Sequence, residues 1–98
     1  MSETVTMAEL CHTCGMTVTE LEELIEFGAL VPLETPVEGP VFSAEWVVPL
    51  RGAARLRSDF DLDVFTVGLL LGHLQRIDEL EKRVRSLEAQ LPGRARNH

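Results

Sequence analysis

The first 50 residues of this 98-residue chain contain neither lysine nor arginine. An acidic segment without cations repels the phosphate backbone of nucleic acids and is suited to a basic protein surface. All nine lysines and arginines lie from Arg51 onward, whereas the first half carries nine glutamates: Glu3, Glu9, Glu20, Glu22, Glu23, Glu26, Glu34, Glu38 and Glu45. The alternative is that these carboxylates form a solvated face that only keeps the protein in solution.

Other absences narrow the class of protein. Tyrosine is missing, and with four Phe and one Trp the core must rely on Leu, Val and Ile. The start, MSETVTMAEL, lacks the basic and apolar regions of a signal peptide, so we expect a cytoplasmic location in which the two cysteines stay reduced. The most apolar run, VFTVGLLLG, is far too short for a membrane span. We therefore expect no membrane partner.

A capping box predicts the first helix. Thr6 and Glu9 have the T-x-x-E spacing in which each residue satisfies a backbone N–H of the other, and a helix from Met7 to about Cys14 would follow. Gly15 supplies a left-handed stop, and a tight turn then leads to the next helix. This order is typical of a helix-turn-helix.

The second helix is strongly acidic. Thr19, with Glu22 three residues later, is expected to cap a helix that runs to Phe27 and stops at Gly28. Its predicted buried stripe is Leu21, Leu24 and Ile25. On a helical wheel Glu23, Glu26 and Phe27 point away from that stripe, and Glu20 and Glu22 lie on its flanks.

A small wing and a third helix are predicted next. Two extended runs, Leu30–Leu33 and Val41–Phe42, flank a Pro/Gly loop and indicate a wing-like β-hairpin. Ser43 is then expected to cap a helix from Ala44 to Asp59. Pro49 lies inside that range, so it either kinks the helix or marks its true start.

The last predicted helix is too long for so small a domain. Asp63 can cap a helix from Val64 to Leu91, about 42 Å at 1.5 Å per residue, so its far half must project or find a partner. Its near half is expected to pack through Val67, Leu70, Leu74 and Ile77. The predicted organisation is mainly α: residues 1–63 form a winged helix-turn-helix domain with a small β-hairpin, 64–91 a dimerisation helix, and 92–98 a frayed tail.

A short heptad seam predicts a parallel homodimer. The spacing of three and four residues selects Ile77, Leu80, Val84, Leu87 and Leu91. With Ile77 at position a, Arg76 and Arg83 at g positions would face Glu81 and Glu88 of the partner subunit in a parallel pair. Each such surface pair contributes only about 0.2–1 kcal/mol, so the charges select orientation more than affinity. The alternative is that the seam packs back onto its own domain.

Residues that could carry chemistry are few. Cys11 and Cys14 have a metal-like spacing, but no second Cys/His pair follows, and at i,i+3 on a helix they are expected to face the core. His73 is a lone helix histidine. No nucleophile–base grouping or phosphate-binding glycine loop is present, so we expect no enzyme, no metal and no cofactor.

The order of elements, with CGMTVTELEELIEFGALVP, resembles the winged helix-turn-helix of MerR-type regulators, which dimerise through a long C-terminal helix. MerR-type regulators that bind DNA need basic residues on the second helix and the wing, where this chain has none. A closer resemblance, over nearly the whole chain, is to the CbpM family of bacterial chaperone modulators. It rests on ELCHTCGMTVTELEELIEFGALVP, VFSAEW, RLRSDFDLD and HLQRIDELEKRVRSLEAQL. Pro49 departs from the helix former expected there.

The resemblance implies a binding function. CbpM proteins bind the J-domain of CbpA, a DnaJ-like co-chaperone, and inhibit its co-chaperone and DNA-binding activities, which would place the chain at the nucleoid only through its partner. J-domains present a basic helix to Hsp70, and an acidic surface could occupy it. From charge and expected exposure, we predict that the contact residues are Glu20, Glu23, Glu26, Phe27, Glu34 and Glu38. Two alternatives stay open: a MerR-like transcriptional regulator that binds DNA, and a dimerising scaffold.

Overall fold

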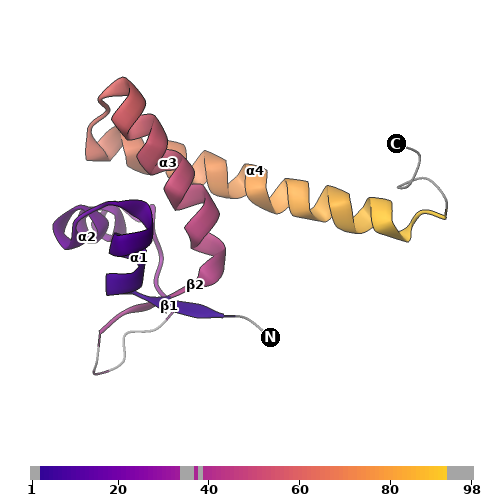
Figure 1. The fold of residues 1–98 in the computed structure, drawn as a ribbon, viewed down its shortest axis with the longest axis horizontal. Helices are drawn as coiled ribbons and strands as arrows, with labels where there is room; N and C mark the ends of the chain where they lie inside the picture. The colour runs from indigo at the N-terminus through magenta and orange to yellow at the C-terminus, as the bar shows by residue number, and fades with distance from the viewer. Residues whose placement is uncertain (1–2, 34–36, 38, 93–98) are drawn as a thin grey trace.

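The computed structural model describes residues 3–33, 37 and 39–92. The described elements, in chain order, are β1 (Thr4–Thr6), α1 (Met7–Cys14), α2 (Val18–Glu26), β2 (Val41–Ser43), the 3-10 helix η1 (Ala44–Trp46), α3 (Val47–Phe60) and α4 (Val64–Gln90). The fold is mainly helical, with a two-stranded antiparallel sheet and a long last helix, as predicted (Figure 1).

The start and end of α1 are those that the sequence predicts. The Thr6 hydroxyl accepts a hydrogen bond from the Glu9 N–H at 3.1 Å, and the Glu9 carboxylate accepts one from the Thr6 N–H at 2.8 Å. Gly15 follows with a φ of 71°, a left-handed conformation that glycine adopts without steric cost. The turn to α2 is therefore short, and Met16 within it is buried.

The cap of α2 lies two residues earlier than predicted. Thr17, rather than Thr19, is the N-cap, and it forms a second capping box with Glu20. The stretch TVTELE contains two overlapping T-x-x-E patterns, and the earlier one adds a helical hydrogen bond from the Leu21 N–H to the Thr17 carbonyl at 3.0 Å. The helix ends at Glu26, and Gly28 follows with a φ of 79°.

The predicted wing hairpin is wrong in its pairing. β2 pairs with β1 at the start of the chain, with Val5 opposite Phe42, instead of pairing with residues 30–33. A single backbone hydrogen bond, from the Leu33 N–H to the Val41 carbonyl at 2.9 Å, links the two predicted arms. Pro32 and Pro40 have no N–H to donate, which weakens the local pairing and leaves β2 free for β1.

Pro49 marks the start of α3 and does not interrupt it. Ser43 caps the 3-10 helix η1, and α3 begins at Val47, so Pro49 lies in its first turn. Proline is tolerated there because the first N–H groups of a helix have no partner within the helix. The helix ends at Phe60, and its C-cap Asp61 adopts a left-handed φ of 56°.

One apolar core joins all the elements. It contains Leu10 and Cys14 of α1, Leu21 and Leu24 of α2, and further side chains from the loop, the sheet, α3 and α4: Met16, Leu30, Phe42, Trp46, Leu50, Ala53, Val67 and Leu71. Ile25, expected in the α2 stripe, is half-buried. Burial of this kind contributes about 25 cal/mol per Å² of apolar surface, so the core and not helix propensity holds α1 and α2 in place.

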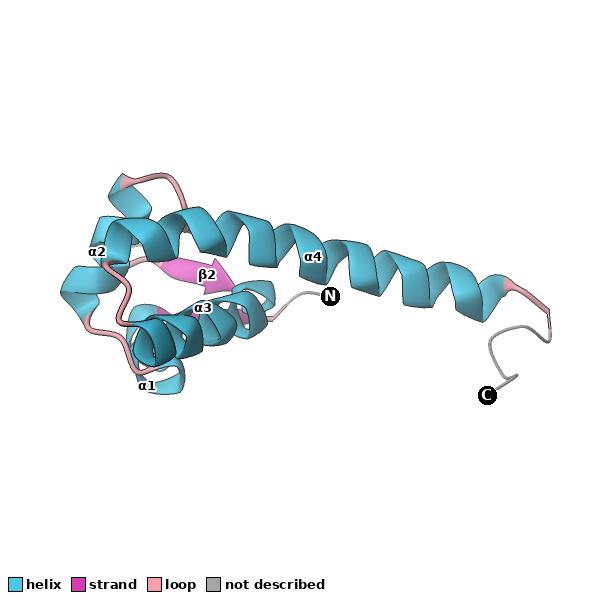
Figure 2. Ribbon diagram, turned by 90° about the horizontal axis from the view of Figure 1, so that it is seen from above, coloured by secondary structure: helices cyan, strands magenta, loops and turns pink. Residues whose placement is uncertain are grey.

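The last helix leaves this core halfway along. Its first turns pack mainly against α3 and next against α2, through Val67 and Leu71. Of the predicted near-half contacts, Leu70 and Leu74 are half-buried, whereas Ile77 is 49% exposed. From Glu79 to Gln90 every residue is exposed, and α4 extends as a rod beyond the rest of the fold in both ribbon views (Figures 1 and 2).

Candidate partner-binding surface

The outer face of α2 is a row of carboxylates. Glu22, Glu23 and Glu26 are exposed, while Leu21 and Leu24 on the opposite face have no exposed surface. The ion pairs found among the described residues involve none of these three carboxylates. The second helix of this helix-turn-helix therefore presents unneutralised negative charge, as the sequence predicts.

Glu20 differs from these three because its carboxylate already has partners. It accepts a hydrogen bond from the Thr17 N–H at 2.9 Å, and its other oxygen lies 2.6 Å from Nη1 of Arg57 on α3. The Thr17 hydrogen bond, together with Arg57, holds the pKa of Glu20 below its ordinary value against the opposing effect of partial burial. Its carboxylate joins α2 to α3, and its contact with a partner stays a prediction.

Phe27 forms part of a larger apolar surface than the sequence indicates. Its ring meets that of Phe65 edge to face, with centroids 5.5 Å apart and planes at 82°. Phe27 is 47% exposed, and Phe65 and Leu69 are each 58% exposed. Together with neighbouring small residues they line a groove of about 290 Å³ between the end of α2 and the start of α4, whose full lining is Phe27, Gly28, Ala29, Phe65, Gly68, Leu69 and Gly72.

The structure brings together part of the predicted contact set and adds to it. Glu23 and Glu26 are exposed on α2, and Phe27, which is also exposed, caps the end of that helix. Glu34 and Glu38 lie outside the described residues. Sequence reasoning missed Phe65 and Leu69, although a signal was available, since both lie on the side of the last helix away from Val67 and Leu71.

The predicted dimer seam is an uncovered apolar strip on the far half of α4. Its members are Ile77, Leu80, Val84, Leu87 and Leu91, with exposed fractions between 41% and 54%. Within the single chain Arg76 lies 3.5 Å from Glu79, and Lys82 lies 3.1 Å from Asp78. Glu81, Arg83 and Glu88 are exposed. The seam does not fold back onto its own domain.

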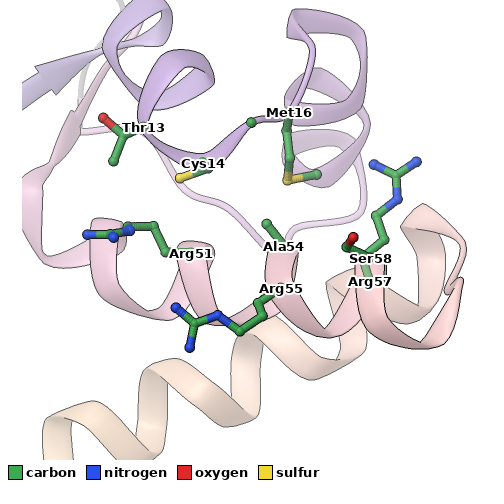
Figure 3. Close-up of a pocket in the computed structure, with 9 residues that line it drawn as sticks. Thr13, Cys14, Met16, Arg51, Ala54, Arg55, Arg57 and Ser58 are labelled. Carbon is green, nitrogen blue, oxygen red and sulfur yellow. The ribbon is translucent and has the colours of Figure 1, made fainter.

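The arginines of α3 line a separate groove of about 440 Å³ opposite the end of α1 (Figure 3). Arg51, Arg55 and Arg57 leave the helix in different directions, and Arg57 is directed toward α2, where Glu20 binds it. Because the guanidinium groups do not converge on one point, the groove does not form a site of defined geometry for an anion. The basic side chains near the helix-turn-helix are therefore on α3, and the second helix of the motif has none.

The cysteines are packed as the sequence predicts. Cys14 is buried and Cys11 half-buried, and both are free thiols. Burial raises the pKa of both thiols, although the nearby charge of Arg51 partly offsets this for Cys14. Across the described part of the chain, no three His, Cys, Asp or Glu side chains gather closely enough to hold a metal ion. No described helix is both long and apolar enough to cross a membrane.

Comparison with known proteins supports the resemblance drawn from the sequence. The chain is 28% identical over 88 residues to the chaperone modulatory protein CbpM of Citrobacter koseri, and the alignment covers 90% of this chain and 87% of that protein. Residues 5–89 match the family model described as MerR HTH family regulatory protein. The matched range runs from β1 almost to the end of α4, so it includes the helix-turn-helix and the long helix alike. The chain therefore belongs to the MerR helix-turn-helix family of regulatory proteins.

Proposed function

We propose that this protein is a chaperone modulator that binds the J-domain of a DnaJ-like co-chaperone of the CbpA type and inhibits its co-chaperone and DNA-binding activities. The observation that carries the proposal is the exposed acidic face of α2, which has three free carboxylates where a DNA reader needs cations. The similarity to a chaperone modulatory protein over most of the chain supports the same assignment.

The proposed mechanism is competition for a basic surface. Glu23 and Glu26 meet the basic helix that a J-domain presents to Hsp70, and Phe27 beside them supplies apolar contact. Complementary charge across an interface accelerates encounter and sets its orientation, and this contribution decreases as salt rises. A J-domain covered in this way cannot engage Hsp70.

A second copy of the chain is part of the proposal. The exposed seam of α4, centred on Val84, fits an identical helix, since its apolar residues repeat every three and four positions. In a parallel pair Arg83 would face Glu88 of the partner subunit. A dimer of this kind carries two acidic α2 faces, both available to J-domains.

Titration calorimetry with the isolated J-domain of the DnaJ-like co-chaperone from the same cell tests the binding function. We expect Glu23→Lys with Glu26→Lys to weaken binding by about 10- to 100-fold, because attraction becomes repulsion at two positions. The matched control is Glu3→Lys with Glu45→Lys, which makes the same change of charge beside the β-sheet. If both double variants bound the J-domain with equal affinity, α2 would not be part of the interface.

DNA binding is the competing function, and the charge distribution opposes it. The cations nearest the motif are on α3, and one of them, Arg57, is paired with Glu20. A gel shift with random duplex DNA at low salt should show no complex with the protein alone. Specific, salt-sensitive DNA binding by the isolated protein would replace the modulator assignment with that of a transcriptional regulator.

A further inference from the structure

The groove between α2 and α4 is an apolar site that the acidic face of α2 does not explain. Phe27, Phe65 and Leu69 line it together, and each has about half of its surface exposed. Contiguous large apolar side chains on a surface mark contacts with other molecules, whereas isolated ones need no explanation. The aromatic pair joins the two sides of the groove, because Phe27 directly follows α2 whereas Phe65 lies on α4, as Leu69 does.

Two glycines of α4 show where the groove is open. A Cβ at Gly68 would meet Leu24, Phe27 and Ala29 at 3.5 Å each, so that position is already in contact with α2. A Cβ at Gly72, one turn further on, would meet nothing within 4 Å. The close approach of α2 thus accounts for the first glycine, while the second leaves free space beside Leu69 in the groove lining.

The size and surroundings of the groove define its occupant. The groove, of about 290 Å³, is walled by the apolar side chains of Phe27, Phe65 and Leu69 on the protein surface, so it suits an apolar side chain of a larger molecule. On α2 the groove adjoins the helix that carries Glu22, Glu23 and Glu26. An occupant must therefore combine a large apolar side chain with flanking cations, as a basic amphipathic helix does.

We propose that this groove anchors an apolar side chain from a basic amphipathic helix of the partner, between Phe27, Phe65 and Leu69, while neighbouring cations of that helix meet the α2 carboxylates. This inference rests on the proposed function and specifies its binding site, because it extends the contact from α2 to the first turns of α4. A buried apolar anchor surrounded by charge pairs is how protein interfaces usually divide affinity and orientation.

A second copy of this chain is the less suitable occupant. A two-fold interface centred on the groove would bring the same patch of both subunits together, and it would set each acidic α2 against the other. The seam on the far half of α4 offers a second copy an apolar strip without that repulsion.

The test fills the groove without unfolding the protein. Gly72→Ala and Gly72→Leu both replace a helical glycine at an uncrowded position, so both should raise the thermal midpoint. Leu fills much of the groove, whereas Ala adds a single methyl group. In calorimetric titration with the isolated J-domain, we expect Gly72→Leu to bind about tenfold more weakly than the wild type or worse, and Gly72→Ala to lie between the two.

A second pair of variants removes an apolar wall. Leu69→Ser should weaken J-domain binding several-fold and leave the slope of affinity against salt unchanged, because it removes no charge. Val48→Ser on α3, where an equally exposed valine lies outside the groove lining, should have no effect. By contrast, Glu23→Lys should make the J-domain affinity less dependent on salt, because it removes a charge that attracts the partner.

Each outcome separates the two proposals. If the wild-type protein does not bind the J-domain, the proposed function fails and the groove inference fails with it. If the wild type binds and Gly72→Leu and Leu69→Ser bind equally well, the groove alone is overturned. If those variants change the mass measured by light scattering but not the J-domain affinity, the groove holds a second copy, which also overturns the inference.

Discussion

The carboxylate of Glu20 lies 2.6 Å from the guanidinium of Arg57 and so joins α2 to α3 across the helix-turn-helix. The same carboxylate accepts the Thr17 N–H that begins α2. One side chain therefore both caps the acidic helix, which the core holds in place, and links it to α3. Both partners are largely covered, with side chains 30% and 22% exposed, so solvent screens the pair less than it screens a fully exposed one.

Glu20 should make stability depend on pH in the acid range. Its folded pKa is lowered, so its contribution is fully present above the ordinary glutamate pKa of about 4.3 and is lost as pH falls through the lower folded value. Glu20→Gln keeps the capping oxygen but removes the charge. We expect it to cost about 0.5–1 kcal/mol near pH 7 and almost nothing near pH 2 in urea unfolding. Glu22→Gln, at an exposed neighbouring position, is the control and should change stability little at either pH.

The corrected cap of α2 gives a matched pair of variants. Thr17→Ala removes the hydroxyl that accepts the Glu20 N–H at 3.1 Å, and should lower the free energy of unfolding by about 1 kcal/mol. Thr19→Ala lies inside the helix, where alanine is favourable, and should be neutral or slightly stabilising. Chemical denaturation measures both. A larger loss for Thr19→Ala would place the cap where the sequence alone suggested it.

The cysteines should react slowly while the protein is folded. Burial raises the pKa of Cys11 and Cys14, so less thiolate is present at pH 8 than for a free cysteine, and Cys14 is also shielded from reagents. With a disulfide reagent such as DTNB, we expect Cys14 to react at the rate of global or local unfolding and Cys11 more slowly than a free thiol. The unfolded protein in urea is the control, and both thiols should react rapidly there.

The far half of α4 should determine oligomeric state. Leu80→Glu with Leu87→Glu introduces charge into the exposed seam and should convert a dimer to a monomer in sedimentation equilibrium at micromolar concentration. Ser86→Glu with Ala89→Glu adds the same charge on the other side of the helix and should leave the dimer intact. A wild-type protein that sediments as a monomer would contradict the assignment of the seam.

Local signals predicted the helices because capping is a short-range property. Each capping side chain bonds to a backbone N–H only two or three residues further along the chain. The caps that were predicted correctly in this way are Thr6, Ser43 and Asp63. The choice between Thr17 and Thr19 was ambiguous since both begin a T-x-x-E pattern. The structure resolves the ambiguity in favour of Thr17, and the Glu20 carboxylate of that capping box also pairs with Arg57, a residue that neither pattern contains.

The sheet and the groove could not be predicted from local pattern. β1 has three residues, and its pairing with β2 depends on chain closure over more than 30 positions. The charge of α2 was evident from composition, and its exposure followed from the helical period. The aromatic contact between Phe27 and Phe65 depends on how α4 crosses α2, which periodicity does not specify.

The exposed stretch of α4 also has a consequence for how the protein can be observed. Between Glu79 and Gln90 the backbone amides are held only by the helix itself, so they exchange with solvent through fraying, without any opening of the core around Leu10 and Phe42. Any molecule that covers the seam slows this exchange by raising the cost of fraying. Deuterium uptake over this one peptide thus measures occupancy of the seam directly, with the amides of the core as an internal reference.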